Sequence, residues 1–342
     1  MEYLIGSKED FWKFVDGIGN EDKIGVITHT DLDGLASAIF LEQILEKKGL
    51  KVEDVLFLKY VKGMFDPVFS NFKEKKITKI FLTDMNADSA DLGSFERLRK
   101  DFDCFLIDHH PVNPELKNRK NIIKTNSSDC SSLVLYDFMD EELKEEWKDI
   151  VCAAVISDFS FKKQENLDFI NSVYSGVTIE NAFDSEPGQI ASTIGSGLTY
   201  YSSNKRKVYE LVLKRDLESL KDAREKVDEV IEEEIAKFKK EGEFYPEKNL
   251  YFYSSCPKFN ITSIASTLVS KEEPEKTFVF ISGQGKFVGV SAKNQSGKED
   301  MNQLVNKGIE GLKEATAGGH VPAAGARFLK KDLQKFKENI LK

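Results

Sequence analysis

Cysteine is scarce in this chain of 342 residues, and the few cysteines are widely spaced. The four residues, Cys104, Cys130, Cys152 and Cys256, form no C-x-x-C pair and no tight cluster. This spacing disfavours both a disulfide framework and a cysteine-based zinc site. We therefore expect buried, free thiols and a cytoplasmic location.

Long apolar runs and an excess of basic residues are also absent. No stretch approaches the roughly 20 apolar residues of a membrane span, and segment 1–17 is too acidic for a signal peptide. The formal net charge is -9, whereas proteins that coat duplexes are basic because they neutralise phosphates. The composition disfavours membrane and duplex-coating proteins. It leaves room for a local cationic groove and for bound divalent ions that add positive charge.

Hydrophobic patterning in the first half predicts an α/β fold, with a parallel sheet covered by helices. Short apolar runs alternate with helical patterns such as 35–48 and 131–139. The candidate strands are Ile24–Thr28, Val55–Leu58, Lys79–Thr83, Cys104–Ile107 and Asn121–Lys124. Ligands of such sheets bind beyond the carboxyl ends of the strands. Polar residues directly after these runs are therefore candidate site residues.

The second half of the chain changes character twice. A charged amphipathic pattern over 200–240 predicts one helix packed along one face, and residues 242–246 end it. Beyond residue 249 the pattern predicts a smaller α/β unit, with strands at 250–253, 277–282 and 286–292 and a helix at 261–270. A glycine-rich segment, 317–320, follows a helix that we expect to end near residue 314.

Histidine is as scarce as cysteine, yet all four histidines fall in predicted loops. His29 lies in THTDLDG, His109 and His110 in LIDHHPV, and His320 in AGGHVPAAG. One such histidine is more often a surface or hydrogen-bonded residue than a ligand. Here three of the four lie within two residues of an aspartate, which favours a metal or substrate site.

The segment H-T-D-L-D-G follows the first candidate strand. Alternate side chains of an extended segment point the same way, so His29, Asp31 and Asp33 can converge. Without a cation, crowded carboxylates repel one another and lose solvation. A helix N-cap near Gly34 would account for one aspartate only. Imidazole with several carboxylates suits a divalent ion, Mn²⁺ first, with Mg²⁺ or Co²⁺ as alternatives.

Further polar residues follow other apolar runs. Asp84 ends FLTD, Asp108-His109-His110 follows a candidate strand, and Asp158 closes VISD. Adjacent histidines after a strand point in different directions, so one can bind metal while the other faces a substrate. Taken alone, Asp158 is equally typical of a cap or turn.

This ordered set of motifs resembles the DHH phosphoesterase superfamily. H-x-D-x-D-G, a strand-end aspartate, D-H-H, a later aspartate and G-G-H occur in the family's order between Thr28 and Gly325. The resemblance implies a DHH catalytic domain at 1–195, a linker helix at 196–245 and a DHH-associated substrate-binding domain at 246–342. Manganese-dependent pyrophosphatases share only the first half and are disfavoured.

The resemblance implies a two-metal site that activates a shared water molecule. The implied ligands are His29, Asp31 and Asp84 for one ion, and Asp33, Asp84, His109 and Asp158 for the other. Asp84 would bridge the ions. His110 would contact the scissile phosphate or protonate the leaving oxygen, and Asp108 would orient a histidine.

The resemblance also implies substrate-binding residues in the second domain. These are Ser291, Lys293, Gly318, Gly319 and His320. Without a Cβ, Gly318 and Gly319 let their N–H groups approach a phosphate, although Gly-Gly is also typical of a tight turn. The chain departs from the family at Ala317, where glycine is usual. It departs again at Lys293, where relatives often carry arginine, and lysine lacks the bidentate fork.

The sequence therefore predicts a RecJ-like, metal-dependent exonuclease. Its substrate would be single-stranded RNA or DNA, or short oligonucleotides, and its product nucleoside monophosphates. The spacing of His29 and Asp31 favours the RecJ-like branch, and the acidic charge favours short strands. One alternative is a phosphatase or phosphodiesterase of small nucleotides, a cyclic dinucleotide or a 3′,5′-bisphosphate. Another is a non-catalytic replication or repair scaffold. A homodimer and a replication or repair partner stay open, since no sequence stripe specifies an interface.

Overall fold

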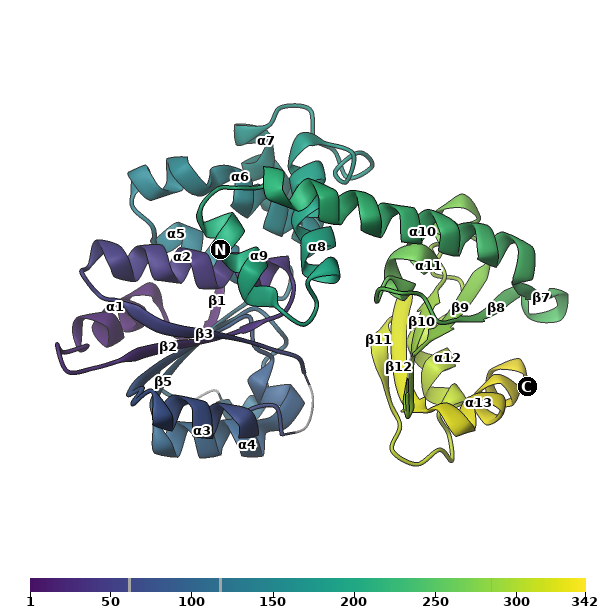
Figure 1. Ribbon diagram of the computed structural model, residues 1–342, viewed down its shortest axis with the longest axis horizontal. Coiled ribbons are helices and arrows are strands. Elements are labelled where there is room, and N and C mark those ends of the chain that lie inside the picture. The colour runs from purple at the N-terminus through teal and green to yellow at the C-terminus, as the bar shows by residue number, and fades with distance from the viewer. Residues whose placement is uncertain (61–62, 117–118, 284) are drawn as a thin grey trace. The chain divides into compact units, whose positions relative to one another are not determined.

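The chain forms two compact units in a computed structural model that describes residues 1–60, 63–116, 119–283 and 285–342. The units are Met1–Arg224 and Glu225–Lys342, and the boundary between them falls inside helix α10 (Lys221–Glu241). Each unit contains one six-stranded sheet (Figure 1). Among the described residues, no helix has both the length and the apolar character that a bilayer span requires.

The first unit alternates strands with helices and then continues as helices alone. Its strands are β1 (Tyr3–Ile5), β2 (Ile24–His29), β3 (Val52–Leu58), β4 (Lys79–Thr83), β5 (Asp103–Asp108) and β6 (Ile122–Thr125). Its helices are α1 (Lys8–Asp16), α2 (Leu32–Lys47), α3 (Asp66–Glu74), α4 (Ala87–Asp101), α5 (Ser131–Phe138), α6 (Glu141–Ser157), α7 (Gln164–Val173), α8 (Glu186–Tyr200) and α9 (Lys205–Leu213).

The strand order in the first sheet is β1-β6-β5-β4-β2-β3. Strands β2 to β6 are mutually parallel, as the sequence predicts, and only β1 runs antiparallel, against β6. The chain adds β3 on one side of β2 and β4 on the other, so the direction of winding reverses between β2 and β4. Such a switch point opens a crevice at the carboxyl ends of the strands.

Helices cover both faces of this sheet, and the strand period of two decides which residues meet them. In β4, Phe81 faces α1, with ring centroids 6.1 Å from Phe11 and 5.2 Å from Phe14. Its neighbours on either side, Ile80 and Leu82, belong to the opposite core, with α3 and α4. Figure 1 shows α3 and α4 on one side of the sheet and α2 on the other. Both faces are buried, which explains the continuous apolar runs of the strands.

The second unit is a smaller α/β structure, with strand order β11-β12-β10-β9-β8-β7. Only β8 and β9 are parallel, and α11 connects them. Its strands are β7 (Glu243–Tyr245), β8 (Leu250–Ser255), β9 (Thr277–Ser282), β10 (Phe287–Lys293), β11 (Thr316–His320) and β12 (Ala323–Leu329). Its helices are α11 (Thr262–Glu272), α12 (Met301–Gly308) and α13 (Leu333–Leu341). Helices α12 and α13 cover one face of the sheet through Met301, Val305, Phe336 and Ile340.

Several sequence-based expectations are wrong in detail. The single helix expected over 200–240 is two helices, α9 and α10, because Arg215 adopts a left-handed backbone (φ 61°) and Asp216 accepts the N–H of Ser219. Such a local side-chain bond competes with helix continuation.

Further along the chain, α12 ends at Gly308, earlier than residue 314. Segment 317–320 is part of an edge strand rather than a turn, so His320 lies in a strand. Cys256 is exposed, unlike the other three cysteines.

Candidate metal centre

Three adjacent strands end at the same crevice and bring their terminal residues together. His29 is the last residue of β2, Asp84 directly follows β4, and Asp108 is the last residue of β5. These strands are neighbours in the order β5-β4-β2, with β4 in the centre. The polar residues therefore meet because parallel strands share one carboxyl edge.

Asp31 is the N-cap of α2, and its Oδ1 accepts the N–H of Gly34 at 3.0 Å. Gly34 packs so closely on the strand end that an added Cβ would lie 2.6 Å from the carbonyl oxygen of His29. The glycine of H-x-D-x-D-G is thus required by this close approach. The cap uses one oxygen of Asp31, and the other lies 2.7 Å from His29 Nδ1.

Asp33 is buried and is bound by a second helix N-terminus. Its two oxygens accept the N–H groups of Ser131 and Ser132, each at 2.8 Å, at the start of α5. Each carboxylate oxygen has a further lone pair. The two helix ends therefore fix Asp31 and Asp33 and still leave acceptor sites directed to the crevice.

Asp84 lies at the centre of the cluster, in a backbone conformation that non-glycine residues rarely adopt (φ 54°). Its N–H donates to Ile107 at 2.9 Å, and its carbonyl accepts the hydroxyl of Tyr60 at 2.8 Å. These bonds hold the left-handed conformation, which costs about 1–2 kcal/mol for a residue with a Cβ. Uncommon backbone geometry of this kind clusters at functional sites.

Three overlapping groups of side chains could each hold a cation, with the candidate ligand atoms of each group within 4.8 Å of one another. The groups are His29, Asp31 and Asp84; Asp33, His109 and Asp158; and Asp84, His109 and His110. Asp84 is the common neighbour: its Oδ2 lies 3.7 Å from His29 Nδ1 and its Oδ1 lies 3.4 Å from His109 Nε2. Asp158, at the C-terminus of α6, lies 3.9 Å from His109 Nδ1.

Mutual repulsion of the buried carboxylates is visible in their pKa values. Burial, and next the charges of Asp33 and Asp31, raise the pKa of Asp84 well above its usual range. Burial, and then Asp33, raise the pKa of Asp158 to about 7. A divalent cation would oppose both shifts, because its positive charge favours the ionised carboxylates and offsets their repulsion.

His109 shows the same need for a cation. Its ring is buried, and Nδ1 has no hydrogen-bond partner. A buried nitrogen without a partner is costly. Imidazole nitrogen with several carboxylate oxygens is a donor set that suits Mn²⁺, Mg²⁺ or Co²⁺. The residues present therefore fit a pair of divalent ions.

His110 points differently from His109, as adjacent residues at a strand end must. Its Nδ1 lies 2.8 Å from Asp108 Oδ1, and about a quarter of its side chain is exposed. Burial opposes the ionisation of Asp108, but Lys124, and after it His110, outweigh burial and hold the pKa of Asp108 well below its usual range. Asp108 is fully buried, and its partner His110 is partly exposed.

The residues expected in the second unit share one region of its sheet. Lys293 of β10 and His320 of β11 both pair with Ala323 of β12, and Ser291 and Gly318 both pair with Gly325. Paired residues project to the same face, and so do residues two apart along a strand. Ser291, Lys293, Gly318 and His320 therefore lie on one face.

Gly319 belongs to the same strand but meets a different constraint. It has φ 149°, and an added Cβ would lie 2.4 Å from the Cα of Ala324. The backbones of β11 and β12 therefore admit only glycine at this position. The face beside it is partly open, since Gly318 and His320 are exposed and Lys293 is half-buried.

The sequence of the first unit matches a known family. Residues 23–156 match the profile of the DHH family, N-terminal domain. The match covers less than half of the chain. No curated protein sequence matches the chain.

Solved structures extend the likeness in fold to the whole chain. RecJ from Thermus thermophilus in complex with Mn²⁺ superposes with a TM-score of 0.70 at 15% identity, over 98% of this chain. This chain spans only 55% of that RecJ chain. Exonuclease RecJ bound to manganese gives a TM-score of 0.70 at 15% identity and covers 98% and 94% of the two chains. CDC45 from Entamoeba histolytica gives 0.57 at 12% identity, with 97% of each chain covered.

Tyr60 is a residue beside the metal-ligand cluster that the sequence analysis missed. Its ring stacks on His29, with centroids 4.2 Å apart and planes 6° apart, and meets His110 edge-on at 5.4 Å. Burial, followed by Asp84, raises the pKa of Tyr60, so its hydroxyl stays protonated. Tyr60 lies two residues after the end of β3. The rule that polar residues directly after a strand are candidate site residues could therefore have identified it.

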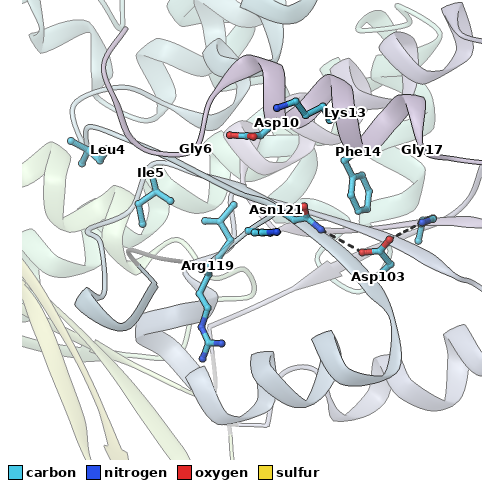
Figure 2. A pocket seen from close by; sticks show the side chains of 13 residues that line it. Leu4, Ile5, Gly6, Asp10, Lys13, Phe14, Gly17, Asp103, Arg119 and Asn121 are labelled. Atoms are coloured by element: carbon cyan, nitrogen blue, oxygen red, sulfur yellow. Dashed lines mark hydrogen bonds and ion pairs between the residues drawn. The ribbon is translucent and has the colours of Figure 1, made fainter.

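A pocket of about 740 Å³ lies at the opposite edge of the first sheet, at the amino ends of its strands. Figure 2 shows its lining, with Asp103 bonded to neighbouring side chains. Lys79 lies 2.7 Å from Asp103, and Asn121 donates to the same carboxylate at 3.5 Å. Lys79 and Asp103 thus neutralise each other, and ligands of open α/β sheets bind at the other edge. We therefore assign no site to this pocket.

Proposed function

We propose that this chain is a metal-dependent phosphodiesterase that hydrolyses single-stranded or short nucleic acids to nucleoside monophosphates. The observation that carries the proposal is the meeting of two candidate ligand groups around Asp84. The match of residues 23–156 to the DHH family model supports it, because the motifs in these residues resemble those of the DHH phosphoesterase superfamily. A pair of divalent ions a few ångströms apart is a recurrent device for phosphoryl-group hydrolysis.

In this proposal His29, Asp31 and Asp84 hold one ion, and Asp33, Asp84, His109 and Asp158 hold the other. Mn²⁺ is the ion we propose, because imidazole accompanies the carboxylates. A RecJ of the same fold was solved with Mn²⁺. Bound ions supply Lewis acidity and activate water as a nucleophile.

The protein's own residues supply orientation and proton transfer. Tyr60 holds both the His29 ring, by stacking, and the Asp84 carbonyl, by a hydrogen bond. Asp108 accepts from Nδ1 of His110, which leaves Nε2 to contact the scissile phosphate or to protonate the leaving oxygen. Asp31 and Asp33 stay fixed by two helix N-termini.

In this proposal the second unit contributes to substrate binding. Lys293 and His320 carry donors, and Ser291, Gly318 and Gly319 offer a hydroxyl and a backbone without side chains. Burial lowers the pKa of Lys293, so a phosphate nearby would restore the preference of its amine for the charged form. With a net charge of -9, long strands gain little from general attraction. Short strands are therefore the proposed substrate.

A non-catalytic scaffold is the second candidate, favoured by the shared fold with CDC45. Such a protein would need no metal ligands, whereas here seven candidate ligands converge in the crevice: His29, Asp31, Asp33, Asp84, His109, His110 and Asp158. We therefore rank the enzyme first.

The test is digestion of end-labelled single-stranded RNA and DNA, from dinucleotides to about thirty-mers, with Mn²⁺ or with chelator. Site sizes of single-strand binders set this range of lengths. Release of mononucleotides only with Mn²⁺ supports the proposal, and the labelled end gives the polarity. Turnover of cyclic dinucleotides or 3′,5′-bisphosphates alone would replace it with small-nucleotide hydrolysis. If no substrate is turned over with any divalent ion, the non-catalytic scaffold becomes the favoured function.

A further inference from the structure

Lys124 is a lysine on β6 with no exposed surface, next to the histidine pair. Its ammonium donates to Asp108 Oδ2 at 2.5 Å, to Asp88 Oδ1 at 2.8 Å and to the carbonyl oxygen of His110 at 3.3 Å. An ammonium has three N–H donors, and these three acceptors engage all of them. Lysine is almost never buried completely unless it is paired.

Asp108 connects this ammonium to the ring of His110. One carboxylate oxygen accepts from Lys124, and the other lies 2.8 Å from Nδ1 of His110. A carboxylate beside a buried ammonium is ionised and can only accept. The ring must therefore present Nδ1–H to Asp108, which directs Nε2 away from it.

Asp88, in the first turn of α4, completes the network from the other side. Its second oxygen accepts the N–H of Asn113 at 3.0 Å, and its carbonyl oxygen accepts the Asn113 side chain at 3.1 Å. Asn113 follows His110 by three residues, so the same network also holds the loop after D-H-H. Lys124, Asp88 and Asp108 together carry a net charge of about -1 when ionised.

We propose that Lys124 is a positioning residue for His110, acting on its backbone directly and on its ring through Asp108. The inference rests on the proposed function, since it assigns the Nε2 face of His110 to the substrate phosphate. Two constraints on one residue, from one buried ammonium, fix both the location and the rotation of the imidazole. Such supporting contacts commonly change activity by about 10–100-fold when removed.

A purely structural ion pair is the competing explanation, because Lys124 also ties β6 to α4 and β5. The two explanations differ in one respect. A structural tie lowers stability and acts the same whether or not residue 110 is histidine. A positioning residue acts only when His110 is present.

The test uses the double variant Lys124→Met with Asp88→Asn. It removes the ammonium and one counter-charge together, so Asp108 is not left with excess positive or negative charge around it. The matched control is Lys79→Met with Asp103→Asn, which removes an ion pair of 2.7 Å at the amino ends of the same sheet.

The expected result is a fall in kcat of roughly 10–100-fold on a dinucleotide. KM and Mn²⁺ affinity should stay within about twofold, and so should kcat of the control. In a His110→Asn background the double variant should change kcat by less than about twofold, because interacting residues are not additive. Full additivity in that background, or an equal fall in the control, would overturn the proposal.

Histidine ring NMR gives a second measurement that needs no activity. The chain has only four histidines, so ¹⁵N-histidine labelling gives few signals, and His110→Asn assigns the one in question. We expect a slowly exchanging Nδ1–H for His110 that exchanges faster in the double variant but not in the control. If the wild type cleaves no phosphodiester, the proposed function fails, and this signal still decides the role of Lys124. An unchanged signal would refute it.

Discussion

The two ends of the first sheet hold charges in opposite states. At the amino ends, Lys79 and Asp103 pair at 2.7 Å beside a pocket of about 740 Å³. At the carboxyl ends, carboxylates face one another, and their repulsion and burial raise the pKa of Asp84 and Asp158. The lysine and aspartate beside the pocket neutralise each other, whereas the carboxylates at the other edge are crowded and short of positive charge. Unsatisfied charge, rather than cavity size, selects the carboxyl edge as the candidate site.

The two ends of the sheet also differ in their effect on the stability of the metal-free protein. Buried like charges raise the free energy of the metal-free fold, while a paired lysine and aspartate do not. The first unit therefore gives up stability at one edge of its sheet. Substitutions that remove a charge should act in opposite ways at the two ends.

The largest effect is expected from Asp84→Asn, which removes the carboxylate at the centre of the candidate ligand cluster. Loss of the shared carboxylate should abolish Mn²⁺ binding and lower hydrolysis by at least about a thousandfold, equivalent to several kcal/mol of transition-state stabilisation. Isothermal titration with Mn²⁺ and the nuclease assay measure this. Retained tight binding of two ions would remove Asp84 from the site.

Asp158→Asn should weaken Mn²⁺ binding by about 10–100-fold and also raise the melting temperature of the metal-free chain. Burial, and then Asp33, raise the pKa of Asp158 from its ordinary value of 3.8 to about 7, so the folded state binds the proton more tightly. Its contribution to stability is full below about pH 4 and is lost as the pH rises to about 7.

Melting curves of the chelated protein between pH 5 and 8, intervals chosen to bracket that change, check this sign. The wild type should lose stability with rising pH more steeply than the variant. Saturating Mn²⁺ should remove the difference in slope. Identical slopes without metal would contradict the repulsion described for the crevice.

Lys293→Ala should raise KM about tenfold and change kcat by less than about threefold, because it weakens substrate binding and leaves the chemical step unchanged. Steady-state kinetics on short oligonucleotides separate the two constants. Lys335→Ala on α13, whose helix packs on the opposite face of the sheet, is the control. Equal KM values for both variants would exclude Lys293 from substrate binding.

The smallest effect is expected from Lys79→Met with Asp103→Asn at the amino ends. An ion pair with a partly exposed partner contributes about 1 kcal/mol or less, so the melting temperature should fall only slightly. Metal binding and hydrolysis should stay within about twofold. A large loss of hydrolysis would show that the amino edge takes part in function after all.

The sequence predicted much of the first unit because strand periodicity and strand-end polar residues are local signals. Strand β4 was predicted with its observed ends, and the parallel sheet followed from the alternation of strands and helices. The antiparallel strand β1 was missed because three residues give too short a pattern.

What could not be read from sequence are contacts between distant segments. Asp33 binds the start of α5, nearly a hundred residues away, and Lys124 binds Asp88, 36 residues earlier in the chain. His320 was placed in a loop because glycines usually break strands, whereas here they let β11 approach β12 closely. Tertiary packing decided each of these cases, and no local pattern encodes it.

The left-handed backbone of Asp84 has a consequence for the history of such chains. Glycine or asparagine would relieve the strain at this position and the repulsion together, so selection for stability alone would remove the aspartate first. A descendant that lost its reaction and kept only its fold should therefore tolerate glycine or asparagine at this position. An aspartate at position 84 therefore indicates selection for the reaction rather than for stability alone.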